Sequence, residues 1–392
     1  MMKLNPAATI TEEFAERIKS ENRSAKMMKL APLIVLACLV VVFLIVCGAS
    51  FLSPKNIMNI LNQMALPLVV ALGLTFVIML GSIDLSIDGS VGMAGSLFAC
   101  FVLNSEFAYD LGFLSVVIAV GVSMLCGLLI GLCHVYLKIP SFMASFAFMY
   151  ICKGIGMVSY QGHPPTIKDP VITALPTTTF LGIPFITWVA IVMFLLCFFI
   201  QEYTAFGRHI YAVGTNENIP RSVGVSVEKV KIGVFTLAGF LFGVAGVIGA
   251  IRLGQGQIAI GDDKMFPAQA AVVVGGTSLA GGKGGVVNTI VGVLIMTVLD
   301  NGLVMLNVNP NIRTGVQGVI ILVAVILTAV ASLYPYRVVS IFTTDAGIIG
   351  EGMRYLHIIR FTYVFFAITQ ILLATLRSIE MVKVAFYLSI ST

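Results

Sequence analysis

The chain has 392 residues, of which 58% are hydrophobic and only 10% are charged, and its mean hydropathy is +1.03. A soluble protein has about a quarter of its residues charged, so this composition excludes a water-soluble globular protein and indicates a surface that faces lipid. The formal net charge of +5 comes from residues scattered beside apolar runs rather than from one basic stripe, so nucleic-acid binding is not expected.

The N-terminal segment, residues 1–30, is polar and precedes the first apolar run. A secretory signal would place its apolar core near the start, so we expect this segment to stay in the cytoplasm. Thr9 and Glu12 have the spacing of a capping box, which predicts a short helix on the membrane surface or against a partner.

Long charge-free runs follow, and continuous runs of about 17–20 or more apolar residues are typical of transmembrane helices. We predict an all-α fold, a polytopic transmembrane helical bundle in a lipid bilayer with discontinuous helices. The layout places twelve Lys and Arg residues on one side and six on the other, which predicts a cytoplasmic N-terminus. The ten core spans are predicted at 31–51, 64–80, 89–103, 111–132, 140–156, 184–201, 231–252, 265–278, 285–306 and 313–331.

The segment 81–96, GSIDLSIDGSVGMAGS, places Asp84 and Asp88 in one of the most apolar regions of the chain. A carboxylate at membrane depth is costly, so its position beside glycines indicates a broken helix that lines a water-filled or substrate-filled cavity. The serines here, Ser86 among them, are candidates to cap the following helix. The alternative is that both carboxylates only cap a helix at the cytoplasmic interface.

Two polar segments separate later spans. Pro164, Pro165, Pro170 and Pro176 crowd the segment 161–184, which is predicted to be an extracytoplasmic loop that could serve as a docking surface. The loop 206–231 is expected on the cytoplasmic side. Asn218 as N-cap and Gly224 after the helix end predict one short helix near 219–223, which a partner could grip. An ordinary interfacial loop is the alternative.

A second glycine-rich break, GGTSLAGGKGG, covers 275–285, and its weak match to the first, which rests mainly on glycines, suggests a parallel internal repeat. Asp300 and Asn301, in the following span, are weaker candidates, because a packed helix-to-helix hydrogen bond explains them about as well. The candidate residues of a substrate pathway are Asp84, Ser86, Asp88, Thr277, Ser278, Asp300 and Asn301.

Motifs for catalysis or cofactor binding are not found. Residues 281–284 look like a phosphate loop but lack the Walker spacing. The four histidines are dispersed and the seven cysteines include no CxxC pair, so we predict no metal site, no cofactor, no catalytic residue and no enzyme activity in this chain alone.

Four strings in order over 31–333 carry a family resemblance: GSIDLSIDGSVGMAG, FGRHIYAVGTNENIPRSVGVSVEKVKI, AAVVVGGTSLAGGKGGVVNTIVG and LDNGLVML. They resemble the membrane permease subunits of ribose-type ATP-binding-cassette (ABC) importers, which also serve xylose, galactose and related sugars. The resemblance implies a permease domain in the inner (plasma) membrane of a prokaryote. It also implies three partners: an ABC ATPase subunit, an extracytoplasmic sugar-binding protein and a second permease copy.

The resemblance further implies that part of the cytoplasmic loop couples the permease to the ATPase. This chain departs from the family pattern at Ile219 and Pro220, where two alanines usually precede the arginine, and at Ser82 and Asp88 in the first break. The implied coupling residues are Gly214, Asn216, Glu217, Arg221, Ser222, Gly224 and Val225.

The end of the chain does not continue this pattern. From about Pro335, the string IFTTDAGIIGEGMRYLHIIRFTYVFFAITQILLATLRS is similar to part of a multidrug-extrusion (MATE-type) transporter. Residues 334–392 are too few for that family's dozen helices, so we expect a fusion near 332–336 that appends a tail with one further helix. A divergent native tail is the alternative.

Two other functions compete with ATP-driven sugar import. In an ion-coupled secondary transporter, Asp84, Asp88 or Asp300 would bind a proton or Na⁺ and drive transport directly. A membrane anchor or assembly scaffold would not transport at all.

Overall fold

The computed structural model describes residues 32–108, 110–309 and 315. The described residues up to Val308 belong to one compact unit, Met28–Val308. The expected surface helix with its capping box, nearly all of the predicted span 313–331 and the tail 334–392 lie outside the described residues.

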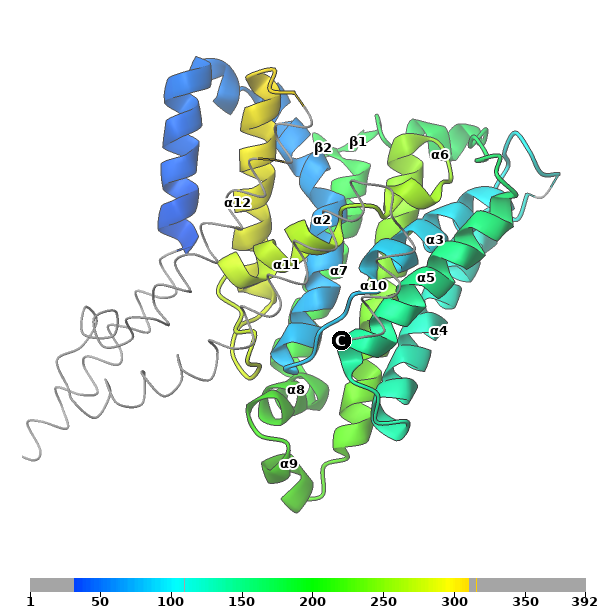
Figure 1. The fold of residues 1–392 in the computed structure, drawn as a ribbon. Helices are drawn as coiled ribbons and strands as arrows, with labels where there is room; N and C mark the ends of the chain where they lie inside the picture. Colours follow the sequence, from blue (N-terminus) through cyan, green and yellow to red (C-terminus); the bar gives the residue numbers. More distant parts are fainter. Residues whose placement is uncertain (1–31, 109, 310–314, 316–392) are drawn as a thin grey trace, which may run out of the picture. The chain divides into compact units, whose positions relative to one another are not determined.

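Helices make up almost all of the regular structure in the described part (Figure 1). Seven of them are long and apolar enough to cross a membrane: Pro32–Leu52, α2 (Pro54–Met79), α4 (Leu114–Tyr136), α5 (Ser141–Tyr160), α7 (Phe185–Tyr203), α10 (Val227–Leu253) and α12 (Val286–Met305). The shorter elements are η1 (Gly48–Leu52), α3 (Ile87–Phe101), α6 (Pro170–Ala174), β1 (Thr179–Phe180), β2 (Ile183–Pro184), α8 (Ala205–Thr215), α9 (Asn218–Ser222), η2 (Ile258–Ile260) and α11 (Met265–Val274).

Two predicted spans, 89–103 and 265–278, need correction. Their helices, α3 and α11, have 15 and 10 residues. At 1.5 Å per residue they rise about 22 and 15 Å, which is short of the roughly 30 Å hydrocarbon core. α3 is also buried along almost its whole length, so other helices surround it instead of lipid. Apolar run length misses this, because the apolar character continues through glycine-rich breaks at which the helix has already stopped.

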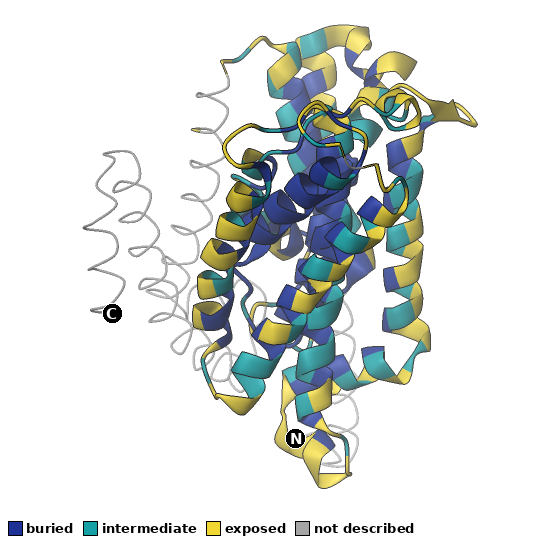
Figure 2. Cartoon of the chain, turned by 90° about the vertical axis from the view of Figure 1, so that its right-hand side faces the viewer, coloured by how far each residue is buried: buried dark blue, intermediate teal, exposed yellow. Residues whose placement is uncertain are grey.

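The centre of the bundle is built around α10, which packs against α2, α3 and α4. Small residues bring α4 and α10 close together. The Ser123 Oγ–H donates to the Gly239 carbonyl at 2.8 Å, and a Cβ on Gly127 would lie only 2.3 Å from the Phe235 carbonyl oxygen. Figure 2 shows the result: buried residues run through the middle of the bundle and exposed residues cover its outer helix faces.

The two ends of the bundle carry different elements (Figure 1). At one end, the proline-rich segment 161–184 forms α6 and a two-stranded antiparallel hairpin in which Thr179 pairs with Pro184. The prediction that this segment does not span the membrane agrees with these short elements. At the other end, the loop 206–231 contains two helices, α8 and α9, where the sequence predicted one.

Candidate functional site

The two glycine-rich breaks begin with the same backbone motif. Gly81, two residues after the end of α2, has φ +76°, and the N–H groups of Gly81 and Ser82 donate to carbonyls of the last turn of α2 at 2.9 and 3.1 Å. Gly276, two residues after the end of α11, has φ +103°, and the N–H groups of Gly276 and Thr277 donate in the same way at 2.9 and 3.2 Å. Both are Schellman motifs, in which a left-handed residue favours glycine. This shared geometry supports the resemblance between the two segments.

Asp84 stabilises the path of the chain through the first break. Its side chain is only 1% exposed, and its Oδ1 accepts the Ser86 N–H at 2.8 Å. Ser86 stands at the N-cap of α3, but its hydroxyl makes no capping hydrogen bond, contrary to its expected capping role. The N–H groups on either side of Asp84 donate to the hydroxyls of Ser141 and Ser145 on α5. Hydrogen bonds to Asp84, Ser141 and Ser145 thus hold the backbone of this turn in place.

Asp88 caps a helix, but not the helix that contains it. Asp88 lies in the first turn of α3, and its Oδ1 accepts the N–H groups of Lys264 and Met265 at 3.3 and 2.9 Å. Those groups begin α11, where a carboxylate is favoured by the free N–H donors and by the helix dipole. Asp88 therefore ties the two broken segments together. The sequence indicates that Asp88 could cap a helix, but it does not show that this helix begins at Met265, 177 residues later in the chain.

The second break is a compact loop closed by its own polar groups. The Thr277 Oγ1 accepts the Gly285 N–H at 3.4 Å, and the Ser278 N–H donates to the Lys283 carbonyl at 3.0 Å. A residue that the sequence did not single out caps the helix that follows: the Oε1 of Gln201, at the end of α7, accepts the Val286 N–H at 2.8 Å.

The last turns of α8 pack directly against both breaks, and we call this contact the break junction (residues 79–81, 211–215 and 281–285). The Tyr211 O–H donates to the Gly284 carbonyl at 2.7 Å, and the Gly282 N–H donates to the Met79 carbonyl at 2.8 Å. Gly214 fits here only because it lacks a side chain: a Cβ would lie 2.0 Å from the Met79 carbonyl oxygen. Among the predicted coupling residues, Gly214 therefore contacts the breaks directly.

The Tyr211 phenol is suited to remain a hydrogen-bond donor. Burial raises its pKa above the ordinary value, and the nearby Glu202 carboxylate raises the pKa further. The phenol is therefore neutral at physiological pH.

The short helix predicted near 219–223 is present one residue earlier, as α9. The predicted N-cap is wrong. Asn218 is already the first residue of the helix, and its N–H donates to the Asn216 Oδ1 at 3.0 Å. Gly224, at φ +84°, follows the helix end as predicted and forms another Schellman motif, in which the Val225 N–H donates one turn back at 3.0 Å.

Two ion pairs hold α10 against α9 and against the residue that precedes α9. Lys231 Nζ lies 2.5 Å from Glu217 Oε1, and Arg221 Nη2 lies 2.6 Å from Glu228 Oε1. The Ser222 hydroxyl donates to a carbonyl within α9. Most of the predicted coupling residues therefore hold the shape of α9.

Apolar side chains project from the outer surface of α9. Ile219 is 61% exposed and Val223, just beyond the helix end, is 74% exposed. The sequence marked Ile219 only as a departure from the family pattern and missed Val223.

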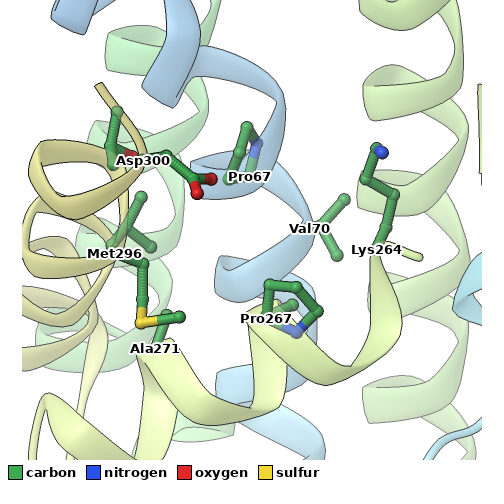
Figure 3. Close-up of a pocket in the computed structure, with 10 residues that line it drawn as sticks. Pro67, Val70, Lys264, Pro267, Ala271, Met296 and Asp300 are labelled. Carbon is green, nitrogen blue, oxygen red and sulfur yellow. The ribbon is translucent and has the colours of Figure 1, made fainter. Parts of the chain in front are cut away.

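A cavity of about 50 Å³ opens between α2, α11 and α12 (Figure 3). Its polar groups are Lys264, Thr297 and Asp300, and Asp300 is a sequence-predicted pathway residue. Sequence reasoning missed the other two, because Thr297 is isolated in an apolar run and Lys264 was counted only as a topology charge. The lining residues are Pro67, Val70, Lys264, Pro267, Ala268, Ala271, Val293, Met296, Thr297 and Asp300.

Other predicted pathway residues do not line this cavity. Asn301, next to Asp300, is 2% exposed and accepts a hydrogen bond from Asn56 Nδ2 at 2.9 Å, which is the helix-to-helix contact considered as its alternative. Asp84, Ser86, Asp88, Thr277 and Ser278 contribute to the breaks instead.

A bundle of membrane-spanning helices with two broken segments beside a small, mostly apolar cavity that contains three polar side chains is the architecture of a membrane transport protein. The family described as branched-chain amino acid transport system, permease component, matches residues 56–325. The chain belongs to this family of ABC permeases, whose members are not enzymes.

The named proteins that this chain resembles are permeases as well. The chain is 35% identical to the ribose import permease protein RbsC of Bacillus subtilis, over 81% of this chain and 98% of the relative. It is 36% identical to RbsC of Haemophilus influenzae over 71% of this chain and 86% of the relative. It is 29% identical to the xylose transport system permease protein XylH of Haemophilus influenzae, over 79% and 97%. No solved structure matches the chain.

The C-terminal segment matches a second family. The family described as MatE matches residues 313–392, which confirms the resemblance of the tail to a MATE-type transporter. This match begins before 334 and overlaps the permease match over residues 313–325.

Proposed function

We propose that this chain is the permease subunit of an ATP-driven importer for a small sugar of the ribose or xylose type. The observation that carries the proposal is the contact of α8 with both glycine-rich breaks, because it links a peripheral helix pair to the helices that line the cavity. The names of the related ribose and xylose permeases support a sugar as substrate. The protein would lie in a bacterial inner membrane with its N-terminus in the cytoplasm.

In the proposed assembly, two permease copies pair in the membrane. An ABC ATPase subunit binds the α8–α9 end, where Ile219 and Val223 offer an exposed apolar contact. A sugar-binding protein docks at the opposite end, near 161–184.

We propose the cavity as part of the sugar pathway. Lys264 offers hydrogen-bond donors, Asp300 offers acceptors and Thr297 offers both, and this combination suits the hydroxyl groups of a neutral sugar. Val70 and Met296 supply apolar walls, which suit the C–H faces of a sugar ring.

Uptake of radiolabelled ribose and xylose by cells tests the energy source. Uptake should stop when the ATPase subunit is deleted and should continue after proton and Na⁺ gradients are collapsed. The opposite pattern would identify an ion-coupled secondary transporter. Absence of uptake of both sugars in cells with all subunits would contradict the proposed substrate class.

Reversal of the charge at Arg221 tests the ATPase contact. Arg221→Glu should abolish uptake while the protein remains in the membrane, because Arg221 is 58% exposed at the proposed contact. The variant also places a carboxylate beside Glu228, so the matched control is the double variant Arg221→Glu with Glu228→Arg, which restores the internal ion pair. Continued loss of uptake in the double variant supports a partner contact, whereas full recovery would show that Arg221 acts only by bracing α9.

A further inference from the structure

We propose that the break junction transmits the movement of α8 to the wall of the cavity, and that Tyr211 is the positioning residue that holds α8 to the start of α12. This inference rests on the proposed function, because it requires an ATPase that displaces α8 and α9.

The junction and the cavity share the same three helices. α2 ends at Met79 in the junction, α11 leads into the second break, and α12 begins at Val286 immediately after the junction. Residues of α2, the start and body of α11, and α12 line the cavity. A displacement at the junction therefore acts on every helix that forms the cavity wall.

The contact between α8 and α2 is made by backbone atoms. Gly214 lies against the Met79 carbonyl, and the same carbonyl accepts the Gly282 N–H at 2.8 Å. A Cβ on Gly281 would lie 2.7 Å from the Gly214 carbonyl oxygen, so the glycines on both sides of the contact are needed for this approach. Backbone packed on backbone has little freedom to yield, and a shift of α8 is passed on rather than absorbed by side-chain rotation.

Tyr211 extends the contact to α12. Its hydroxyl donates to the Gly284 carbonyl, two residues before α12 begins. Gln201 and Thr277 hold the next two N–H groups along the chain, those of Val286 and Gly285, but they belong to α7 and to the break itself. The Tyr211 hydrogen bond is thus the one of these three contacts that connects the start of α12 to α8.

The first test removes only the hydroxyl. Tyr211→Phe is compared with wild type in the complete complex with its ATPase and sugar-binding subunits, reconstituted in proteoliposomes with radiolabelled ribose or xylose. We expect the sugar transported per ATP hydrolysed to fall several-fold, while the ATPase subunit stays bound and ATP hydrolysis continues. Tyr203→Phe is the matched control, because Tyr203 is 67% exposed at the end of α7, outside the junction. An unchanged ratio in Tyr211→Phe, or an equal fall in Tyr203→Phe, would overturn the inference.

A second measurement reports the cavity wall without depending on the sugar. Met296→Cys on α12 places a thiol in the cavity, and its labelling rate with a small thiol reagent is measured with and without ATP, after subtraction of the parent protein's background. We expect ATP to change the rate several-fold, and Tyr211→Phe to remove most of that change. An ATP-dependent change that persists in Tyr211→Phe would overturn the inference. If the wild-type complex transports neither sugar but shows the Tyr211-dependent change in labelling, the proposed substrate fails and the junction mechanism stands.

A methyl group added where the backbones of α8 and α2 meet tests the same contact independently. Gly214→Ala introduces a methyl group against the Met79 carbonyl and should also lower the sugar transported per ATP. Gly154→Ala on α5 is the matched control, since a Cβ there meets no atom within 4 Å. Equal ratios in the two variants would contradict the role of the junction.

Discussion

Three acidic residues that interrupt apolar sequence have three different environments. Asp84 stabilises the turn into α3, Asp88 caps α11, and Asp300 lines the cavity. The cost of placing carboxylates among apolar residues predicts that each needs polar partners or water beside it. It does not predict which, because the partners of Asp88 are far away in the sequence.

Asp84 provides a prediction at the scale of one residue. Asp84→Leu removes the acceptor of the buried Ser86 N–H, and an unsatisfied buried donor costs about 1–3 kcal/mol. Asp84→Asn retains a side-chain oxygen in the same place. We therefore expect the Leu variant to melt at a lower temperature in detergent and to assemble or transport poorly, and the Asn variant to stay close to wild type. A Leu variant with wild-type stability and uptake would show that the turn does not depend on this side chain.

At the scale of the helix, the prediction from sequence was good where a local signal exists. The apolar runs located the long helices, and Gly224 marked the end of α9, because a left-handed residue after a helix favours glycine. The failures have two different physical causes. α3 was predicted as a span because hydropathy does not record where a helix stops, and the contact of Tyr211 with Gly284 depends on packing between distant segments.

The packing of α4 on α10 gives a prediction with a control in the same helix. Gly127→Ala places a methyl group 2.3 Å from the Phe235 carbonyl oxygen, and overpacking of this kind costs about 1–3 kcal/mol. Gly121→Ala changes the same residue type on the same helix, where a Cβ meets no atom within 4 Å. Thermal unfolding in detergent should show a loss of stability for Gly127→Ala and none for Gly121→Ala. Equal melting temperatures would contradict close packing of these helices.

The orientation of the whole molecule in the membrane is predicted by the charge distribution. Asn216 and Thr166 are both exposed; Asn216 lies between α8 and α9 and Thr166 lies before α6, and Figure 1 shows α9 and α6 at opposite ends of the bundle. Single cysteines at these two positions, in a background without the seven native cysteines, should react with a membrane-impermeant thiol reagent from opposite sides, with Asn216→Cys accessible from the cytoplasm. Labelling of both from the same side would exclude the predicted topology.

The C-terminal segment gives a prediction about the extent of the functional unit. The permease family matches residues 56–325, and the MatE match extends over 313–392, so a chain cut after Ser332 keeps the whole permease match and loses most of the second. The removed sequence carries Arg360 and Gln370 among apolar residues, which require a protein surface or the membrane interface as their partner.

We expect the chain cut after Ser332 to insert, bind its ATPase and take up sugar at least as fast as the full-length protein. A cut after Val308 serves as the matched control, because it also removes residues of the permease match and should abolish uptake. Uptake and membrane abundance are measured side by side for the full-length protein and the two shortened chains, to show whether the residues after Ser332 are needed. Loss of both in the chain cut after Ser332 would mean that the tail is an integral part of the permease, and the fusion hypothesis would have to be abandoned.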